Sequence, residues 1–205
     1  KAHYVSYGAF KVPMVIRLIV GKGWGQGPKH SQSLENLFSI IPGLKVLTPS
    51  LPIDLKGMTI AAIEDNNPVI IIEHRWSHYV NGNVPKGYYK SQILKPVQLT
   101  KGIDLTLVSN SITTIECIQI VKTFKEFNIL ISHFDLRVCR PLNLIDIIKS
   151  VKKTKNFVCI DLGSEMFGIG SEMCAIISVK FFEELKFPPI KIGMPDYPTP
   201  SSRGY

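Results

Sequence analysis

The chain begins with apolar runs that alternate with amphipathic stretches. Residues 11–20, KVPMVIRLIV, form a β-rich run whose composition predicts a strand buried on both faces. A helix is expected from about Gln32 to Ile40, where apolar residues recur at helical spacing until Pro42 and Gly43 stop it. Those apolar positions are Leu34, Leu37, Phe38 and Ile41.

The alternation continues over the next thirty residues. Residues 44–49, LKVLTP, predict a strand, and residues 52–65, PIDLKGMTIAAIED, predict a helix. Residues 68–74, PVIIIEH, are apolar without interruption up to Glu73, which is typical of a central parallel strand. Strands that alternate with helices indicate a parallel sheet with helices on its faces.

From about Trp76 to Lys101 the hydrophobic pattern fails. Glycines, prolines and polar residues follow one another there without a period. A gap of this length between two ordered runs is best interpreted as an interdomain connection. We therefore expect a first unit at residues 1–80, a linker at residues 81–101 and a second unit at residues 102–205.

The second unit restarts the alternation of strand and helix. Its expected strands are residues 104–110, 129–138, 156–162 and 189–195, and its expected helices are residues 113–127, 141–153 and 170–185. In the first of these helices Ile115, Ile118, Val121 and Phe124 should face inward. This order predicts a compact α/β domain with a mainly parallel sheet, followed by a proline-rich end, residues 195–205, that lies extended over the surface.

Composition and charge narrow the classes of function. The net charge is +8, but the only dense basic cluster, residues 149–155, lies at an expected helix end, where cations are favoured. A basic surface is therefore a better interpretation than a nucleic-acid site. No apolar run reaches the roughly 18 residues of a membrane span. The chain does not begin with Met and shows no signal-peptide pattern, so we expect a processed product or a fragment.

The cysteines do not indicate a metal or redox site. Cys117, Cys139, Cys159 and Cys174 show no CxxC spacing, and each lies in an apolar context. We expect buried free thiols in a reducing compartment.

The stretch GWGQGPKHSQSLENLF, residues 23–38, carries the most distinctive local chemistry. Three glycines and Pro28 precede His30, and a helix is expected directly afterwards. Glycines let the backbone pass close to a ligand, and the positive end of a helix favours an anion. The alternative is that His30 merely ends the loop and caps the helix.

Several motifs resemble one known family. Residues 23–74, from GWGQGPKHSQSLENLF to PVIIIEH, look like the β subunit of the thiamine-diphosphate-dependent decarboxylating component of 2-oxo acid dehydrogenase complexes, a branch of the transketolase-like family. FDLRVCRPLN, residues 134–143, and GIGSEM, residues 168–173, resemble the C-terminal domain of the same subunit. The resemblance implies the later half of a pyrimidine-binding domain, a linker and a transketolase C-terminal-type domain. It also implies that the glutamate that activates the cofactor belongs to an N-terminal part absent from this chain.

The resemblance implies a catalytic role for His30, which matches the active-site histidine of the family's HSQ motif. An imidazole has a pKa near neutrality, so it can donate a proton or hydrogen bond to the oxyanion that forms from a 2-oxo acid. The family also binds potassium through main-chain carbonyls at a helix-to-strand turn, here within AAIEDNNP. The matching residues are Met14, Ala62, Ile63, Asp65 and Asn67. An ordinary turn with Asp and Asn chosen for turn chemistry is the alternative.

What the chain lacks indicates its partners. It contains no GDG followed by Asn-Asn, the family's magnesium and diphosphate site, and no Walker motif. The resemblance therefore implies thiamine diphosphate and magnesium held mostly by a partner α subunit that carries GDG and Asn-Asn. A lipoyl acyltransferase is a further possible partner, and the expected location is the cytoplasm or, in a eukaryote, a mitochondrial or plastid matrix. The alternative function is a non-catalytic assembly or interaction module of the same fold.

Two departures from the family pattern leave the substrate open. LIVGK, residues 18–22, replaces a more glycine-rich segment, and IDLGSEMFGIG, residues 160–170, replaces the usual acidic strand end. Self-association is expected through residues 104–195, because a chain that keeps only the later strands of its first domain exposes a strand edge and part of an apolar face, which the resembled family buries between subunits. The last helix is the candidate for the contact, since it has more apolar residues than one narrow stripe needs. They are Met173, Ile176, Ile177, Val179, Phe181 and Phe182. The alternative is a helix buried on both sides within one domain.

Overall fold

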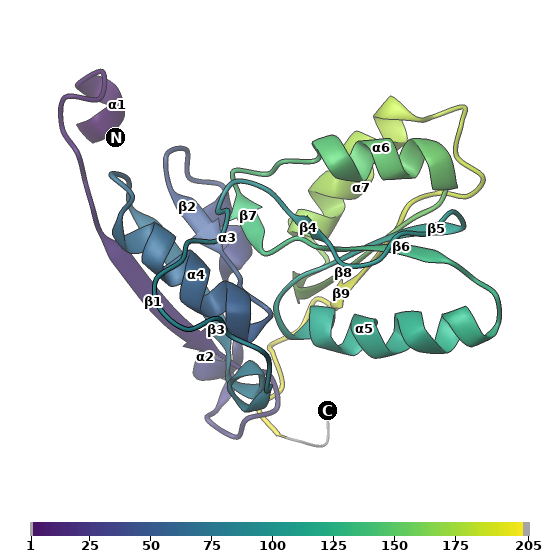
Figure 1. Ribbon diagram of the computed structural model, residues 1–205, viewed down its shortest axis with the longest axis horizontal. Helices are drawn as coiled ribbons and strands as arrows, with labels where there is room; N and C mark the ends of the chain where they lie inside the picture. Colours follow the sequence, from purple (N-terminus) through teal and green to yellow (C-terminus); the bar gives the residue numbers. More distant parts are fainter. Residues whose placement is uncertain (1, 203–205) are drawn as a thin grey trace.

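A computed structural model describes residues 2–202, which form two sheets (Figure 1). The first sheet has the order β1-β3-β2-β7, with β1 (Val15–Val20), β3 (Val69–His74) and β2 (Lys45–Leu47) parallel and β7 (Val138–Arg140) antiparallel. The prediction of a central strand at residues 68–74 is confirmed, since every residue of β3 is buried. The prediction that residues 11–20 are buried on both faces is wrong, because β1 is an edge strand with Ile16 and Ile19 exposed.

The helices of the first unit agree with the sequence pattern only in part. Helix α4 (Pro52–Ile63) forms as expected, and its Met58 and Ala62 pack against Leu47 and Ile71 of the sheet. Of the helix expected from Gln32 to Ile40 only α3 (Glu35–Ser39) forms, because Gln32 is extended and separates it from an additional short helix, α2 (Pro28–Ser31). Of the four apolar positions of the expected helix, Leu34, Leu37 and Ile41 are exposed and Phe38 packs on the core. A short helix α1 (Ala2–Val5) precedes β1.

The second sheet has the predicted alternation and one additional strand. Its order is β4-β6-β5-β8-β9, and all neighbours are parallel except β4. The strands are β4 (Val97–Gln98), β5 (Leu105–Ser109), β6 (Ile131–Asp135), β8 (Phe157–Ser164) and β9 (Ile190–Met194). Helix α5 (Ser111–Glu126) covers one face, and α6 (Ile145–Thr154) and α7 (Ile169–Lys180) cover the other (Figure 1).

Two details of the second unit differ from expectation. The strand expected over residues 129–138 is divided, because β6 ends at Asp135 and the chain then crosses to the first sheet as β7. Phe124 is exposed, so its predicted inward position is wrong, whereas Val121 is buried as predicted and Cys117 is buried with it.

The two sheets share one hydrophobic core. Val46, Ile70 and Ile72 of the first sheet belong to the same buried cluster as residues of the second unit. Those partners include Phe134, Leu136, Ile147, Met173 and Ile177. Most of the segment between the sheets, residues 80–96, lacks regular structure but is anchored on α4, since the Ser91 N–H donates to the Gly57 carbonyl at 3.0 Å. The two units are therefore packed against each other.

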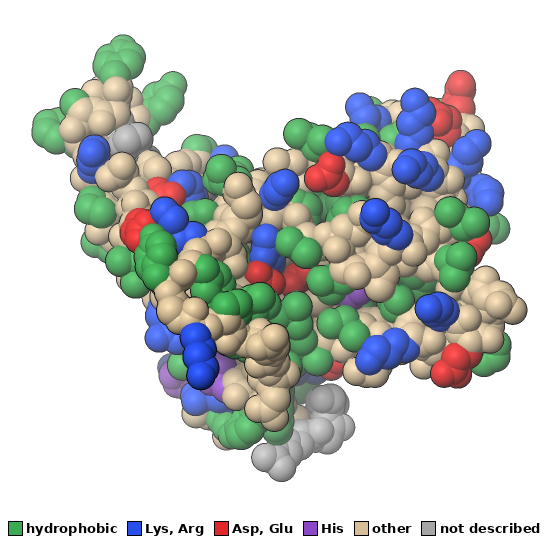
Figure 2. Space-filling view, in the orientation of Figure 1, with side chains coloured by type: hydrophobic (Ala, Val, Ile, Leu, Met, Phe, Trp, Pro, Cys, Tyr) green, Lys and Arg blue, Asp and Glu red, His purple; other side chains and the backbone are tan. Residues whose placement is uncertain are grey.

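On the face in view, Lys and Arg side chains are densest around α6, where acidic and apolar side chains lie among them, and they are sparser elsewhere (Figure 2). Among the described residues, no helix is both long and apolar enough to cross a membrane. All four cysteines are free thiols, with Cys117, Cys139 and Cys159 buried and Cys174 partly buried.

Candidate active-site edge

The glycine loop that follows β1 and the segment that follows β3 begin at the same end of the first sheet, where the carboxyl ends of these parallel strands lie. β1 and β3 are parallel and Val20 pairs with His74, so the loop that follows β1 starts beside the 3₁₀ helix η1 (Arg75–Tyr79). Gly21 is needed at this point, because a Cβ there would lie 2.9 Å from the Cβ of Arg75. In open α/β sheets, ligands bind at the carboxyl ends of the strands.

The loop is held on η1 by aromatic rings. The ring centres of Trp24 and Trp76 are 4.8 Å apart in a T-shaped contact, and Tyr79 stacks on Trp24 at 5.8 Å. The Trp76 Nε1–H donates to the Lys22 carbonyl at 3.2 Å, and the Arg75 guanidinium lies 5.3 Å from the centre of the Trp24 ring. These contacts fix the root of the loop, while Gly25 and Gly27 have positive φ and open space where a Cβ would point.

The predicted end segment lies against this loop. Residues 195–202 contain no helix or strand. The Gly23 N–H donates to the Pro200 carbonyl at 3.2 Å, and the Gly25 N–H donates to the Ser201 carbonyl. The expectation of an extended segment over the surface is thereby confirmed for its described part.

His30 lies in α2 and not before a helix. Its N–H donates to the Gly27 carbonyl at 3.3 Å, and its side chain is exposed. Helix α2 has four residues and no side-chain cap, so neither the expected positive helix end behind His30 nor the alternative of a capping histidine is present. The imidazole is therefore accessible to solvent.

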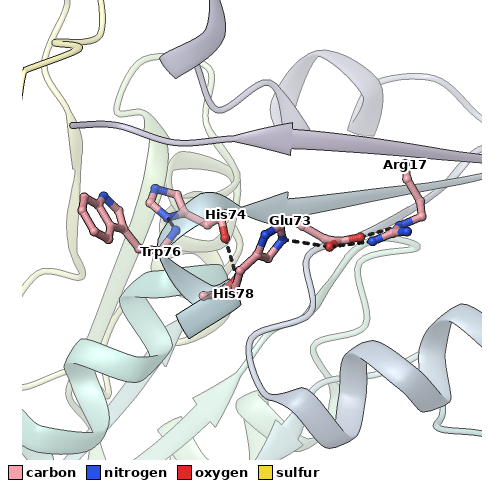
Figure 3. Close-up of polar contacts among 6 residues, drawn as sticks. Arg17, Glu73, His74, Trp76 and His78 are labelled. Carbon is pink, nitrogen blue, oxygen red and sulfur yellow. Dashed lines mark hydrogen bonds and ion pairs between the residues drawn. The ribbon is translucent and has the colours of Figure 1, made fainter. Parts of the chain in front are cut away.

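Glu73 is the centre of a charged network that the sequence did not indicate (Figure 3). Its side chain is 2% exposed, and both of its oxygens are bound by Arg17, from Nε at 2.7 Å and from Nη2 at 2.9 Å. His78 Nε2 lies 3.1 Å from Oε2 of the same carboxylate. The hydrogen bond to Glu73 raises the pKa of Arg17, and the carboxylate in turn orients the partly exposed imidazole of His78.

His74, the last residue of β3, has a buried ring nitrogen without a hydrogen-bond partner among the described residues. Burial lowers its pKa to about 4, so the ring is neutral. Its Nδ1 accepts the Trp76 N–H at 3.2 Å, which places the ring proton on Nε2. That Nε2 is buried without a hydrogen-bond partner among the described residues.

The residues of the expected potassium turn lie together after α4. Asp65 Oδ1 accepts both the backbone N–H and the side-chain amide of Asn67 at 2.8 Å, and the Lys45 ammonium binds Asp65 Oδ2. The Met14 carbonyl accepts the Val69 N–H at 2.8 Å and the Ala62 carbonyl accepts the Asp65 N–H at 3.2 Å. Within the described chain, no group of three or more His, Cys, Asp or Glu side chains is placed to hold a metal ion.

Comparison with known proteins decides the family. Residues 1–79 match the family described as the transketolase pyrimidine-binding domain, and residues 95–204 match the transketolase C-terminal domain. The chain belongs to the transketolase family. A solved structure titled "Split gene transketolase, inactive beta4 tetramer" has the same fold, with a TM-score of 0.72 and 21% identity over 91% of this chain and 59% of that one.

The transketolase-family chain is similar to β subunits of two kinds of oxidoreductase. It is 34% identical over 202 residues to the acetoin:2,6-dichlorophenolindophenol oxidoreductase subunit beta of Bacillus subtilis, covering 98% of this chain and 59% of the relative. It is 36% identical over 200 residues to the pyruvate dehydrogenase E1 component subunit beta of Acholeplasma laidlawii, covering 97% and 61%. The chain therefore spans about 60% of the length of these relatives.

Proposed function

We propose that this chain is part of a β-type subunit of a thiamine-diphosphate-dependent enzyme that decarboxylates a 2-oxo acid together with an α subunit. The observation that carries the proposal is the similarity to β subunits along almost the whole chain, at 34% and 36% identity. The relatives that are β subunits of dehydrogenases favour this function over a non-catalytic module of the same fold.

The strand edge suits a bound cofactor. Gly25 and Gly27 leave open space beside the loop, and the buried Nε2–H of His74 lacks an acceptor among the described residues. Thiamine diphosphate, when bound, supplies the carbanion that decarboxylation of a 2-oxo acid needs. The sequence contains no GDG that is followed by Asn-Asn, since Asn66 and Asn67 have no GDG before them, so we assign the magnesium and diphosphate site to the α subunit and only the pyrimidine side to this chain.

His30 is the residue to which we assign acid–base chemistry. Its exposed imidazole lies on the loop that leaves the carboxyl end of β1, and no ion pair involving it is present among the described residues. In the reaction it would donate a hydrogen bond or proton to the oxyanion that develops on the substrate. Glu73 and Arg17 would serve to fix the neighbouring strand end.

Potassium is proposed at the turn after α4. The carbonyls of Ile63, Asp65 and Asn67 accept no hydrogen bond from the described residues, so they remain available to a cation. Met14 and Ala62 would complete the set, although the Met14 carbonyl already accepts the Val69 N–H and the Ala62 carbonyl accepts the N–H groups of Glu64 and Asp65. The negative end of the α4 dipole favours a cation at this position.

The assembly and location are proposed on the same basis. An α subunit would complete the site, a lipoyl acyltransferase is a possible acceptor, and two copies of this chain would associate through residues 104–195. One relative is named a chloroplastic pyruvate dehydrogenase E1 component subunit beta-3 from Arabidopsis thaliana, 32% identical over 97% of this chain and 49% of the relative. This supports the cytoplasm or an organelle matrix as the location.

Activity of the assembled enzyme tests the proposal. The full-length subunit that contains this chain would be co-expressed with its α partner and supplied with thiamine diphosphate and magnesium. Dye reduction would be followed with pyruvate, branched-chain 2-oxo acids and acetoin. We expect turnover with at least one of the 2-oxo acids, whereas turnover of acetoin alone would support the enzyme class but not the decarboxylation. An intact assembly that turns over none of them would contradict the proposal and favour the non-catalytic module.

A further inference from the structure

Two buried carboxyl groups face each other across the boundary between the two units. Glu35 is the first residue of α3, is 1% exposed, and has both side-chain oxygens without a hydrogen-bond partner among the described residues. A Cβ built on Gly163 would lie 2.9 Å from Glu35 Oε1 and 3.2 Å from Asp161 Oδ1. The bare backbone of Gly163 therefore lets the two acids approach from opposite units.

The same place holds the two units together by directional bonds. Asn36 Oδ1, beside Glu35, accepts the Ile169 N–H of α7 at 3.0 Å. Asp161 Oδ1 accepts the Gly163 N–H at 2.7 Å, which fixes the carboxyl that α3 meets. Helix α3 is thus docked on the turn between β8 and α7, and the Glu35 carboxyl lies buried in this contact.

The surroundings of the pair are acidic or neutral. The Cys139 thiol faces Glu35 from β7, the Ser33 hydroxyl lies beside it, and the Asn110 side chain faces Asp161 from the start of α5. Asn110 Oδ1 is likewise buried without a partner. The basic side chain of the adjoining cleft, Arg140, donates to the Ser39 carbonyl at 3.2 Å. Two ionised carboxylates would be costly in such a place.

We propose that Glu35 and Asp161 hold one shared proton between the two units, and that this proton latches α3 to the turn between β8 and α7. A proton lets one carboxyl donate to the other and removes one of the two buried charges. Two carboxyl groups at short range do not both ionise, because the two negative charges repel each other, and such a pair therefore retains one proton.

The latch borders a cleft of ligand size. A cleft of about 710 Å³ lies between the units, and Asn36, Gly168 and Ile169 form one side of it. Release of the proton would leave two negative charges at this contact and favour separation of α3 from α7. The pair would thus couple the width of the cleft to pH.

The direction of the pH effect follows from the pKa values of Glu35 and Asp161 in the closed and in the opened state. Burial first, and repulsion from Asp161 second, raise the pKa of Glu35 to about 8, and burial also raises the pKa of Asp161. In the opened state the groups meet water and regain their ordinary values. Opening therefore releases one proton at intermediate pH, and the opening equilibrium should grow about tenfold per pH unit until about pH 8.

Hydrogen exchange at single amides tests the latch. The Ile169 N–H, bound to Asn36, would be followed from pH 6 to pH 9 and corrected for the exchange rate of the free peptide. In the wild-type chain its protection should fall about tenfold per pH unit up to about pH 8 and then level off. Glu35→Gln should remove this slope, and Asp161→Asn serves as a second variant if Glu35→Gln does not fold.

Controls separate the shared proton from other causes. Glu126→Gln, at an exposed site on α5, should leave the slope unchanged. Infrared difference spectra between pH 6 and pH 9 would be recorded in an Asp135→Asn background, because Asp135 also titrates in this range. Loss of a protonated carboxyl band should appear in Asp135→Asn but not when Glu35→Gln is added. A wild-type protection that is independent of pH would overturn the proposal. So would a protection that follows sodium or magnesium concentration instead, since a cation would then occupy the site.

Discussion

Glu73 ends the central strand of the first sheet with a buried charge. Arg17 crosses from the neighbouring strand with two hydrogen bonds to it, at 2.7 and 2.9 Å, and His78 returns from η1 with a third contact at 3.1 Å. The sequence shows an arginine and a glutamate 56 residues apart, and no spacing rule connects them. Only the parallel register of β1 and β3, which pairs Arg17 with Ile71, places the two side chains on one face.

Removing Arg17 should therefore weaken the fold moderately. Arg17→Met would leave the Glu73 carboxylate with one partner in a buried position, and we expect a loss of about 1.5 kcal/mol in the free energy of unfolding. The estimate is modest because more than half of the Arg17 side chain is in contact with water. Urea unfolding measures it, with Lys11→Met, an exposed site just before β1, as the matched control. Equal stability of both variants would show that the network contributes nothing.

His30 is the residue at which activity and stability should separate. In the assembled enzyme, His30→Gln should lower kcat about a hundredfold, the usual scale for a positioned acid or base. The unfolding midpoint of the variant should equal that of the wild type within error, because the His30 side chain is exposed and makes no hydrogen bond or ion pair with the described residues. Lys29→Gln, the exposed neighbour, is the control and should retain activity. Unchanged kcat in His30→Gln would remove His30 from the chemistry.

Helices and strands with a continuous or strongly periodic apolar pattern could be predicted from the sequence. The end of β6 and the position of β1 at the edge of its sheet could not. The apolar run of β3 and the helix α4 follow directly from composition and spacing. The division between β6 and β7 could not be predicted, because apolar residues continue through Leu136 and Val138 while the chain changes sheet. The exposure of β1 could not be predicted either, because the hydrophobic pattern of a strand does not show whether other strands lie on both sides of it.

Only part of the candidate site could be predicted from the sequence. The HSQ motif led to His30, and the glycines before it led to the loop. Trp76 and His78 lie in the segment that we interpreted as pattern-free, so no sequence signal marked them. Glu35 lies among polar residues near the start of the helix expected from Gln32 to Ile40, and only Gly163, which is 128 residues later, brings Asp161 against it.

Helix α7 has one buried and one exposed apolar side. Met173 and Ile177 are fully buried in the core, whereas Val179 near the end of α7 and Phe182 just after it are 84% and 81% exposed. Ile177→Ala should cost about 3 kcal/mol in the free energy of unfolding, as expected for a large-to-small change in a core. The double variant Val179→Glu with Phe182→Glu should leave stability unchanged but lower self-association in sedimentation at tens of micromolar. Unchanged association would exclude this end of α7 from the dimer contact.

At the scale of the whole molecule, the contact between the two units is rich in buried acids. Ser50 from the first unit donates to Asp135 Oδ1 of the second at 2.9 Å, and Arg137 forms an ion pair with Asp54 that crosses in the opposite direction. Burial raises the pKa of Asp135 to about 7. Because such groups prefer to stay protonated when folded, the packing of the units should depend on pH.

Stability should fall as pH rises from 6.5 to 8. Glu35 and Asp135 have folded pKa values near 8 and 7, above their ordinary values, so the stability that their protons add disappears as pH rises through those values. Burial lowers the pKa of His74 and His133 to about 4, and their opposite effect acts only below about pH 6.5. We expect a loss of roughly 2 kcal/mol by urea unfolding between these pH values. Glu35→Gln combined with Asp135→Asn should flatten the curve, and a wild-type stability that rises over this range would contradict the assignment.

The central claim is that this chain contributes half of a thiamine diphosphate site. Calorimetric titration with thiamine diphosphate and magnesium tests it most directly, performed on this chain alone, on the α partner alone, and on the α subunit assembled with the full-length subunit that contains this chain. We predict micromolar binding by the assembly and no tight binding by this chain, because it contains no GDG that is followed by Asn-Asn. Micromolar binding by this chain alone would contradict the account.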